Sequence, residues 1–181
     1  MLVETGYIRL TKGPRENWAR PAIDPLFRSA ARAYGTSVVG VILTGGLNDG
    51  TAGMFEVKAR GGTTVVQDPS DSVTPNMPQS VIDHVIVDYV VPVKDIGSLL
   101  TSLVADHHAT LPVNVPQTGD SQEKGMTAEF TPNHPVAVTC PDCGGALRQS
   151  ELGTLTQFSC HIGHVYTAEV DVHPWNVTNF E

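Results

Sequence analysis

The chain has 181 residues, enough for one ordinary domain with a small appendage, and 40% of them are hydrophobic, which suffices for a core. The formal net charge of −8 argues against nucleic acid or an anionic membrane surface as a partner. No apolar run approaches the length of a membrane span, and the N-terminal segment does not resemble a signal peptide. We therefore expect a cytoplasmic protein without membrane insertion.

The first predicted elements are a strand and a helix. Apolar and polar residues alternate over 6–12, which is typical of a half-exposed strand. Asp24, followed by proline, predicts the N-cap of a helix, and apolar residues then recur at helical spacing as far as Gly35, the predicted C-cap. This helix leads directly into an apolar run over 38–43, which predicts a buried strand.

A glycine-rich loop follows that strand and opens into a predicted helix over 52–60. Further elements follow in order: a strand over 63–67, a short helix over 77–82, a strand over 85–91 and a last helix that Asp95 could cap. Strands that alternate with helices indicate parallel pairing. The sequence therefore predicts an α/β fold, a partial doubly wound and mostly parallel sheet, in residues 1–108.

The second half of the chain has a different character. Proline, threonine, glycine and charged residues dominate 109–135, which predicts a flexible linker. A compact segment that carries all three cysteines follows over 136–166, and 167–181 forms a tail without a clear pattern. An odd number of cysteines, two of them close together, favours metal binding in a reducing compartment over disulfides.

Asp49 is the candidate functional residue of the glycine-rich loop. Asn48, Asp49 and Gly50 are common turn formers, so a simple turn is one reading. A phosphate-binding loop is a second reading, but the Lys-[Ser/Thr] ending of a P-loop is absent. A third reading makes Asp49 the buried carboxylate that orients a catalytic histidine. Local pattern alone does not choose among these.

A series of motifs along the first part of the chain bears on the choice. They are Gly13-Pro14-Arg15-Glu16-Asn17, Arg20-Pro21-Ala22-Ile23-Asp24-Pro25-Leu26-Phe27-Arg28-Ser29-Ala30-Ala31, Leu43-Thr44-Gly45, Asn48-Asp49-Gly50, Lys58-Ala59-Arg60-Gly61-Gly62, Gln67-Asp68-Pro69 and Asn76-Met77-Pro78. Residues 2–105 closely resemble, through these motifs, the chemotaxis protein-glutamate methylesterases of the CheB type. Such enzymes hydrolyse methyl esters of glutamate side chains on chemoreceptors with a serine, a histidine and an aspartate.

The resemblance implies roles for the loop. The aspartate of the family lies in the Asn-Asp-Gly loop, so the position that carries it here is Asp49. Thr44, Gly45 and Asn48 would shape the loop around it. The resemblance also implies a methylated chemoreceptor, or a receptor-like protein, as the substrate partner.

The sequence departs from the family pattern in one respect that matters for catalysis. The family serine lies in a Gly-x-Ser-x-Gly-Gly loop that precedes the matching part, and this motif does not occur in the chain. Ser29 falls inside a predicted helix and His84 follows the Asp49 loop, so neither stands where the family has its nucleophile or base. We therefore expect an isolated chain to be nearly inactive unless a fragment or partner chain supplies the serine and histidine.

The second candidate site lies in the cysteine-bearing segment. Cys140 and Cys143 form a Cys-x₂-Cys pair, and Cys160 and His164 follow as Cys-x₃-His. Three thiolates and one imidazole form a set that Zn²⁺ accepts tetrahedrally, and four protein ligands make such a site structural. His161 is an alternative fourth ligand, but Gly163 favours a turn that brings His164 back towards the metal. The alternative is that the three cysteines bind no metal and that their spacing is coincidental.

The Cys-Pro-x-Cys-Gly-Gly and Cys-x-x-Gly-His motifs of this segment resemble zinc-ribbon-like tails that follow some methylesterase-like domains. The expected function is therefore that of a protein-glutamate methylesterase in chemotaxis-type phosphorelay signalling, with structural Zn²⁺ as the only cofactor. The alternative is a non-catalytic relative that acts as a zinc-containing binding or regulatory module.

Overall fold

The computed structural model describes residues 1–110 and 134–168 of the chain. It begins with an antiparallel hairpin of β1 (Leu2–Glu4) and β2 (Tyr7–Arg9). The predicted strand over 6–12 is thus present in shorter form, and all three residues of β2 are exposed. Its partner β1 was not predicted, because three residues are too few for a period to show.

The predicted parallel sheet is confirmed. It has the order β3-β4-β5, with β3 at Val39–Ile42, β4 at Thr63–Gln67 and β5 at Tyr89–Val91, and both pairs are parallel. The predicted strand over 85–91 is too long, because Val85 still belongs to the end of the preceding helix, where its N–H donates to the Val81 carbonyl at 2.8 Å. The Asp88 carboxylate accepts from the Thr64 backbone N–H at 2.9 Å.

Four α-helices accompany the sheet: α1 (Ile23–Tyr34), α2 (Thr51–Ala59), α3 (Asn76–His84) and α4 (Val93–Thr110). Gly35 is the C-cap of α1, as predicted, and it has a positive φ of 51°. Asp95 does not cap α4, because that helix already begins at Val93. None of the helices within the described residues is long and apolar enough to cross a membrane.

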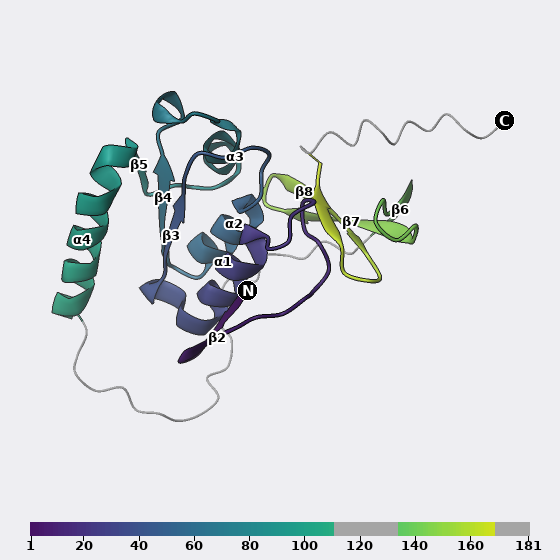
Figure 1. The fold of residues 1–181 in the computed structure, drawn as a ribbon, viewed down its shortest axis with the longest axis horizontal. Coiled ribbons are helices and arrows are strands. Elements are labelled where there is room, and N and C mark those ends of the chain that lie inside the picture. The colour runs from purple at the N-terminus through teal and green to yellow at the C-terminus, as the bar shows by residue number, and fades with distance from the viewer. Residues whose placement is uncertain (111–133, 169–181) are drawn as a thin grey trace.

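The helices place the core on one side of the sheet. In Figure 1, α1 and α2 lie on one side of β3 and β4, and α4 lies on the other. The core side chains come from β3, β4, α2, α3 and the residue after α3: Ile42, Met54, Val66, Val81 and Val85. Helices α1 and α2 approach closely, since a Cβ on Gly53 would lie 2.6 Å from Cβ of Phe27. This close approach brings the start of α1 next to the Asp49 loop.

A separate antiparallel sheet forms the second part of the described chain. Its order is β6-β7-β8-β9, with β6 at His134–Thr139, β7 at Ala146–Leu152, β8 at Leu155–Cys160 and β9 at Val165–Thr167. We call residues 134–168 the cysteine module. Its strands extend one or two residues beyond the expected 136–166, while most of the predicted linker and tail lies outside the described residues.

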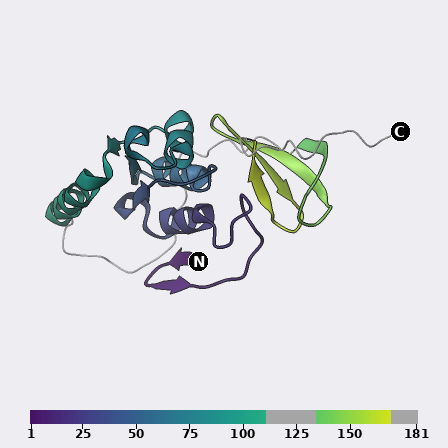
Figure 2. The ribbon, with the colours of Figure 1, turned by 45° about the horizontal axis from the view of Figure 1, so that its top comes forward.

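The cysteine module lies against the α/β part on the side away from α4 (Figure 2). The contact continues the second sheet, because Glu16 and Val165 form an isolated parallel bridge. The Asn17 N–H donates to the Val165 carbonyl at 2.9 Å, and the Val165 N–H donates to the Arg15 carbonyl at 3.3 Å. The segment that leads into α1 thus acts as a short fifth strand beside β9.

Candidate functional site

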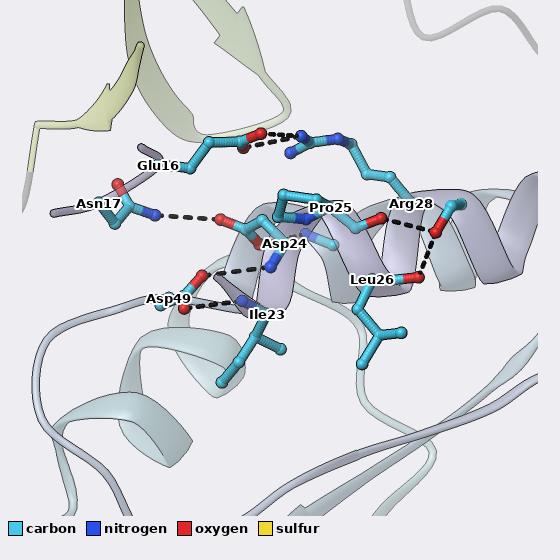
Figure 3. A network of polar contacts seen from close by, with 10 residues as sticks. Glu16, Asn17, Ile23, Asp24, Pro25, Leu26, Arg28 and Asp49 are labelled. Carbon is cyan, nitrogen blue, oxygen red and sulfur yellow. Dashed lines mark hydrogen bonds and ion pairs between the residues drawn. The ribbon is translucent and has the colours of Figure 1, made fainter. Parts of the chain in front are cut away.

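Asp49 lies beyond the carboxyl end of β3, immediately before Gly50, the N-cap of α2, and is only 6% exposed. Its two carboxylate oxygens accept from the backbone N–H groups of Ile23, at 2.8 Å, and Asp24, at 3.1 Å (Figure 3). These are the first N–H groups of α1, whose own N-cap residue, Ala22, has no side-chain acceptor. Asp49 therefore caps a helix that is distant in sequence.

The prediction that Asp24 caps α1 is wrong. The helix begins one residue earlier, at Ile23, so Asp24 lies inside the first turn and its backbone N–H is one of the groups that need an acceptor. Its carboxylate points into the protein, is 1% exposed, and accepts from Gly53 N–H at 2.6 Å and Asn17 Nδ2 at 3.0 Å. Asp24 thus joins α1, α2 and the preceding loop.

Two buried carboxylates consequently share the N-terminus of α1. Burial raises the pKa of Asp24 to about 7, and the nearby charge of Asp49 acts in the same direction. Burial also raises the pKa of Asp49, although the backbone N–H groups of Ile23 and Asp24 favour its ionised form. Both acids are therefore harder to ionise than surface aspartates. A cationic neighbour such as a protonated histidine would favour the ionised form of Asp49.

Thr44 and Gly45 connect the Asp49 loop to its surroundings. The Thr44 N–H donates to Gln67 Oε1 at 2.8 Å, and the Thr44 hydroxyl accepts from Thr74 N–H at 2.8 Å. Gly45 accepts from the Met77 N–H at 3.0 Å, and a Cβ at Gly45 would come within 2.6 Å of the Met77 methyl carbon. A side chain at Gly45 would therefore displace the end of the Met77 side chain, and the hydrogen bonds of Thr44 and Gly45 fix the course of the loop.

Asn48 makes a contact that sequence reasoning missed. It is 2% exposed, and its side-chain amide donates to the hydroxyl of Thr167 in the cysteine module. Thr167 is itself fully buried, and its backbone N–H donates to Asn17 Oδ1 at 3.1 Å. Asn17 thus holds Thr167 with its oxygen and Asp24 with its nitrogen. No sequence signal links Asn17 to a residue 150 positions away.

Ser29 and His84 take part in other contacts. The Ser29 hydroxyl donates to the Pro25 carbonyl at 2.7 Å and accepts from the Val3 N–H at 2.9 Å, which attaches the N-terminal hairpin to α1. His84 Nδ1 lies 2.9 Å from the Thr154 hydroxyl of the cysteine module. These contacts give both residues structural positions, as the sequence led us to expect for Ser29.

The cysteine module brings four candidate metal ligands together. The ligand atoms of Cys140, Cys143, Cys160 and His164 all lie within 4.8 Å of one another. His164 Nδ1 is 3.6 Å from Cys140 Sγ and 3.5 Å from Cys160 Sγ, and the sulfurs of Cys143 and Cys160 are 3.6 Å apart. This cluster could hold a metal ion, and its thiolate and imidazole donors suit Zn²⁺.

Local backbone turns aim these side chains. Gly144, with a φ of +70°, donates its N–H to the Cys140 carbonyl at 2.7 Å and so closes a tight turn around the first two cysteines. Gly163, with a φ of +101°, donates to the Cys160 carbonyl at 3.0 Å and turns His164 back. His161 is exposed and its ring packs against Gly145. Of the two histidines, the cluster contains His164.

Further groups surround the cluster. Asp142 Oδ2 lies 3.9 Å from Nε2 of His164 and accepts from the Tyr166 hydroxyl at 2.9 Å. A carboxylate near the second nitrogen of a ligating histidine is common in metal sites, where it fixes the ring orientation. Backbone N–H groups of His164 and Ile162 lower the pKa of the Cys160 thiol to about 6, despite the opposing effect of burial.

Comparison with known families identifies the first part of the chain. Residues 1–100 match the family model described as CheB methylesterase, which is more than half of the chain. The chain belongs to the CheB methylesterase family. The resemblance inferred from the motifs around Asp49 is therefore confirmed, and so is the α/β fold class.

Individual relatives match over the same part. A protein-glutamate methylesterase/protein-glutamine glutaminase of Pyrococcus abyssi is 41% identical over 97 residues, which cover 54% of this chain and 26% of the relative. A putative enzyme of the same name from Leptospira interrogans is 43% identical over 91 residues, or 50% of this chain and 47% of the relative. This CheB-family chain thus matches less than half the length of either relative.

Among solved structures, the CheB methylesterase catalytic domain of Thermotoga maritima is 42% identical, with a TM-score of 0.47, over 48% of this chain and 46% of that chain. The CheB family match ends at residue 100, so it does not include the cysteine module. The contact between Asn48 and Thr167 therefore joins the family part of the chain to a part outside it.

Proposed function

We propose that residues 1–110 carry the aspartate-bearing part of a protein-glutamate methylesterase site, with Asp49 as the residue that orients the base histidine. The supporting observation is the buried carboxylate at the carboxyl end of β3, inside the stretch that matches the CheB family. Ligands of open α/β sheets bind at that end of the strands. The relatives' names supply the substrate class, glutamate methyl esters of a protein. The resemblance of the motifs implies that this protein is a methylated chemoreceptor or a receptor-like protein.

In this proposal Asp49 accepts a hydrogen bond from the imidazole and stabilises the imidazolium that forms as the serine attacks the ester carbonyl. Thr44, Gly45 and Asn48 fix the loop that presents it. The serine and histidine come from a complementary segment with the family's Gly-x-Ser-x-Gly-Gly loop, which this sequence does not contain. Loss of the nucleophile alone costs about 10⁶-fold in turnover in a comparable hydrolase, so without that segment we expect negligible activity.

A methyl-ester hydrolysis assay on methylated receptor tests the proposal, with this chain alone and with a fragment that carries the family's serine and histidine loops. We expect activity in the mixture only. Asp49→Asn should then lower turnover about 10⁴-fold, as loss of the orienting carboxylate does in a serine protease. Asp95→Asn, which changes an exposed acid on α4, is the matched control. An unchanged rate for Asp49→Asn would contradict the role of Asp49, and activity of the chain alone would contradict the need for a partner.

We further propose that Cys140, Cys143, Cys160 and His164 bind one structural Zn²⁺. The support is the four ligand atoms within 4.8 Å and the neighbouring Asp142 carboxylate. Metal analysis of the purified protein should give about one Zn²⁺ per chain. Cys143→Ala and His164→Ala should abolish stoichiometric binding, whereas His161→Ala should leave it intact. Binding that persists in His164→Ala and is lost in His161→Ala would assign the fourth ligand to His161.

The second candidate function is that of a zinc-containing binding or regulatory module without catalysis. It is favoured by the arrangement around Asp49, whose oxygens both accept from α1 while its neighbour Asn48 is covered by Thr167. No hydrolysis in the mixture, together with retained receptor binding, would support it. A cytoplasmic location and a role in phosphorelay signalling remain part of the methylesterase proposal, and the three free cysteines suit a reducing compartment.

A further inference from the structure

The metal-ligand cluster and the Asp49 loop are joined by three consecutive residues. His164 ends the cluster, and the next residues, Val165–Thr167, form β9. Val165 exchanges backbone hydrogen bonds with the segment before α1, and Thr167 is held by the side chains of Asn17 and Asn48. Asn48 is the sequence neighbour of Asp49. A short series of covalent and hydrogen bonds therefore connects His164, a candidate metal ligand, to the loop that carries Asp49.

Side-chain packing strengthens this connection. The Trp18 and Tyr166 rings have centroids 5.3 Å apart and are tilted by 56°. Tyr166 also contacts the cluster, since its hydroxyl lies 3.5 Å from Cys140 Sγ. Arg15 reaches Asp142, the carboxylate beside His164, at 3.5 Å. The side chains that support the cluster thus also contact the loop that leads into α1.

Backbone strain gathers at the same contact. Among the described residues, the non-glycine residues with positive φ are Asn17, at 47°, Trp18, at 66°, and Leu47, at 62°. Such conformations cost free energy for residues with a side chain and persist only where surrounding contacts enforce them. Asn17 and Trp18 are held by Val165, Tyr166 and Thr167, and Leu47 precedes Asn48. Without β9, these loops lose the contacts that Val165, Tyr166 and Thr167 supply.

We propose that metal occupancy of the cysteine module controls the Asp49 loop. With metal bound, β9 holds Asn17 and Asn48 and so fixes the loop that presents Asp49. When the metal leaves, β9 loses its anchor at His164, the strained segments relax, and the loop loses this fixed arrangement. This inference rests on the metal site proposed above and adds a regulatory role to a structural one.

The proposal has a reciprocal consequence. If the metal stabilises the contact of Thr167 with Asn17 and Asn48, that contact must stabilise the bound metal by the same factor. Couplings of this kind change affinity by about 5- to 150-fold. A substitution in the α/β part, more than a hundred positions from the ligands, should therefore weaken Zn²⁺ binding. A purely local structural role for the metal does not predict this.

The test uses the full chain and Zn²⁺ itself, in competition with a chromophoric chelator. Thr167→Val removes the hydroxyl that accepts from Asn48 at nearly constant shape and should weaken Zn²⁺ binding about fivefold or more, while Thr167→Ser should restore it. Asn17→Ala, which lies outside the module, should also weaken Zn²⁺ binding about fivefold or more. Gln79→Ala, which removes an exposed amide on α3, is the matched control and should bind as the parent chain does.

Hydrogen exchange of the parent chain provides the second readout. Removal of Zn²⁺ by a chelator should speed exchange of the Asn17, Ile23 and Asp24 amides about fivefold or more and leave Val66, in the central strand, unchanged. A chain that binds no Zn²⁺ overturns both the metal site and the coupling. A chain that binds one Zn²⁺, with unchanged exchange and unchanged affinity in Asn17→Ala and Thr167→Val, overturns the coupling alone.

Discussion

The α/β part and the cysteine module show two different ways to stabilise a small fold. The α/β part buries a cluster of apolar side chains from a parallel sheet and its helices, among them Ile42, Met54 and Val66. The cluster in the cysteine module consists of Cys140, Leu147, Cys160 and Tyr166, so two of its four buried members are candidate metal ligands. We therefore expect the first part to fold by burial of its apolar side chains and the second to depend on a metal held by its candidate ligands.

Metal removal should give the largest difference between the two parts. Structural Zn²⁺ contributes about 10 to 16 kcal/mol of apparent binding free energy in small zinc modules, far more than a core of this size can replace. Chelation should therefore unfold residues 134–168 and leave α1–α4 folded. The check is two-dimensional NMR before and after chelation, together with circular dichroism at 222 nm, which reports the helices. A chelated chain that keeps the dispersed signals of β7 and β8 would contradict the expectation that residues 134–168 need the metal to fold.

A fall in pH should change the stability of the two parts in opposite directions. The pKa of Asp24, about 7 in the folded chain against 3.8 ordinarily, means that the folded state binds a proton that the unfolded state has released. Stability of the α/β part should therefore rise as pH falls from 7 towards 4, by about 4 kcal/mol at most, and this contribution should be constant above pH 7. Asp49, whose pKa is also raised, adds a change of the same sign.

The cysteine module should lose stability over the same fall in pH, because protons compete with Zn²⁺ for the thiolates and the imidazole. Urea unfolding at several pH values, followed at 222 nm, reports the α/β part, and bound Zn²⁺ reports the module. Asp24→Asn is the control, since it removes one titrating group and should reduce the slope at 222 nm to the contribution of Asp49 without changing the loss of Zn²⁺. An unchanged slope in Asp24→Asn would assign the effect to other groups.

A core substitution should affect only the α/β part. Met54 is fully buried between β3 and the helices. Met54→Ala should cost about 3 kcal/mol of unfolding free energy, because it removes a buried methylene, the thioether sulfur and a methyl group and leaves a cavity. Zinc stoichiometry should remain at about one per chain. The exposed Val73 provides the control, and Val73→Ala should change stability by less than about 0.5 kcal/mol. Loss of Zn²⁺ in Met54→Ala would show that the module depends on the α/β core.

The two parts also differ in which of their structural features could be predicted from the sequence. Periodicity gave the strands and helices of the α/β part, because each element repeats apolar residues at its own spacing. It failed at the ends of elements, where the Asp49 and Asp88 carboxylates accept from backbone N–H groups. The cysteine spacing predicted the cluster, since metal ligands lie on two short turns.

The contact between the two parts could not be predicted in this way. It depends on Asn17, Asn48 and Thr167, three uncharged polar residues in loops and at a strand end, with no shared period or motif. Asn17 and Asn48 lie within motifs of the family, but nothing in those motifs indicates a partner beyond residue 100. Such contacts arise only once the tertiary fold brings the segments together.

The smallest predicted effect concerns the structural role of Asp49 apart from any catalytic one. Asp49→Asn keeps one oxygen for the Ile23 or Asp24 N–H group, but its amide nitrogen cannot accept from the other. The expected loss is about 1 kcal/mol, as for one lost hydrogen bond. Asp49→Ala should cost more, because both N–H groups then lack their acceptor. Urea unfolding at 222 nm measures both, and equal stability of the two variants would contradict a stabilising role for the hydrogen bond that Asp49→Asn keeps.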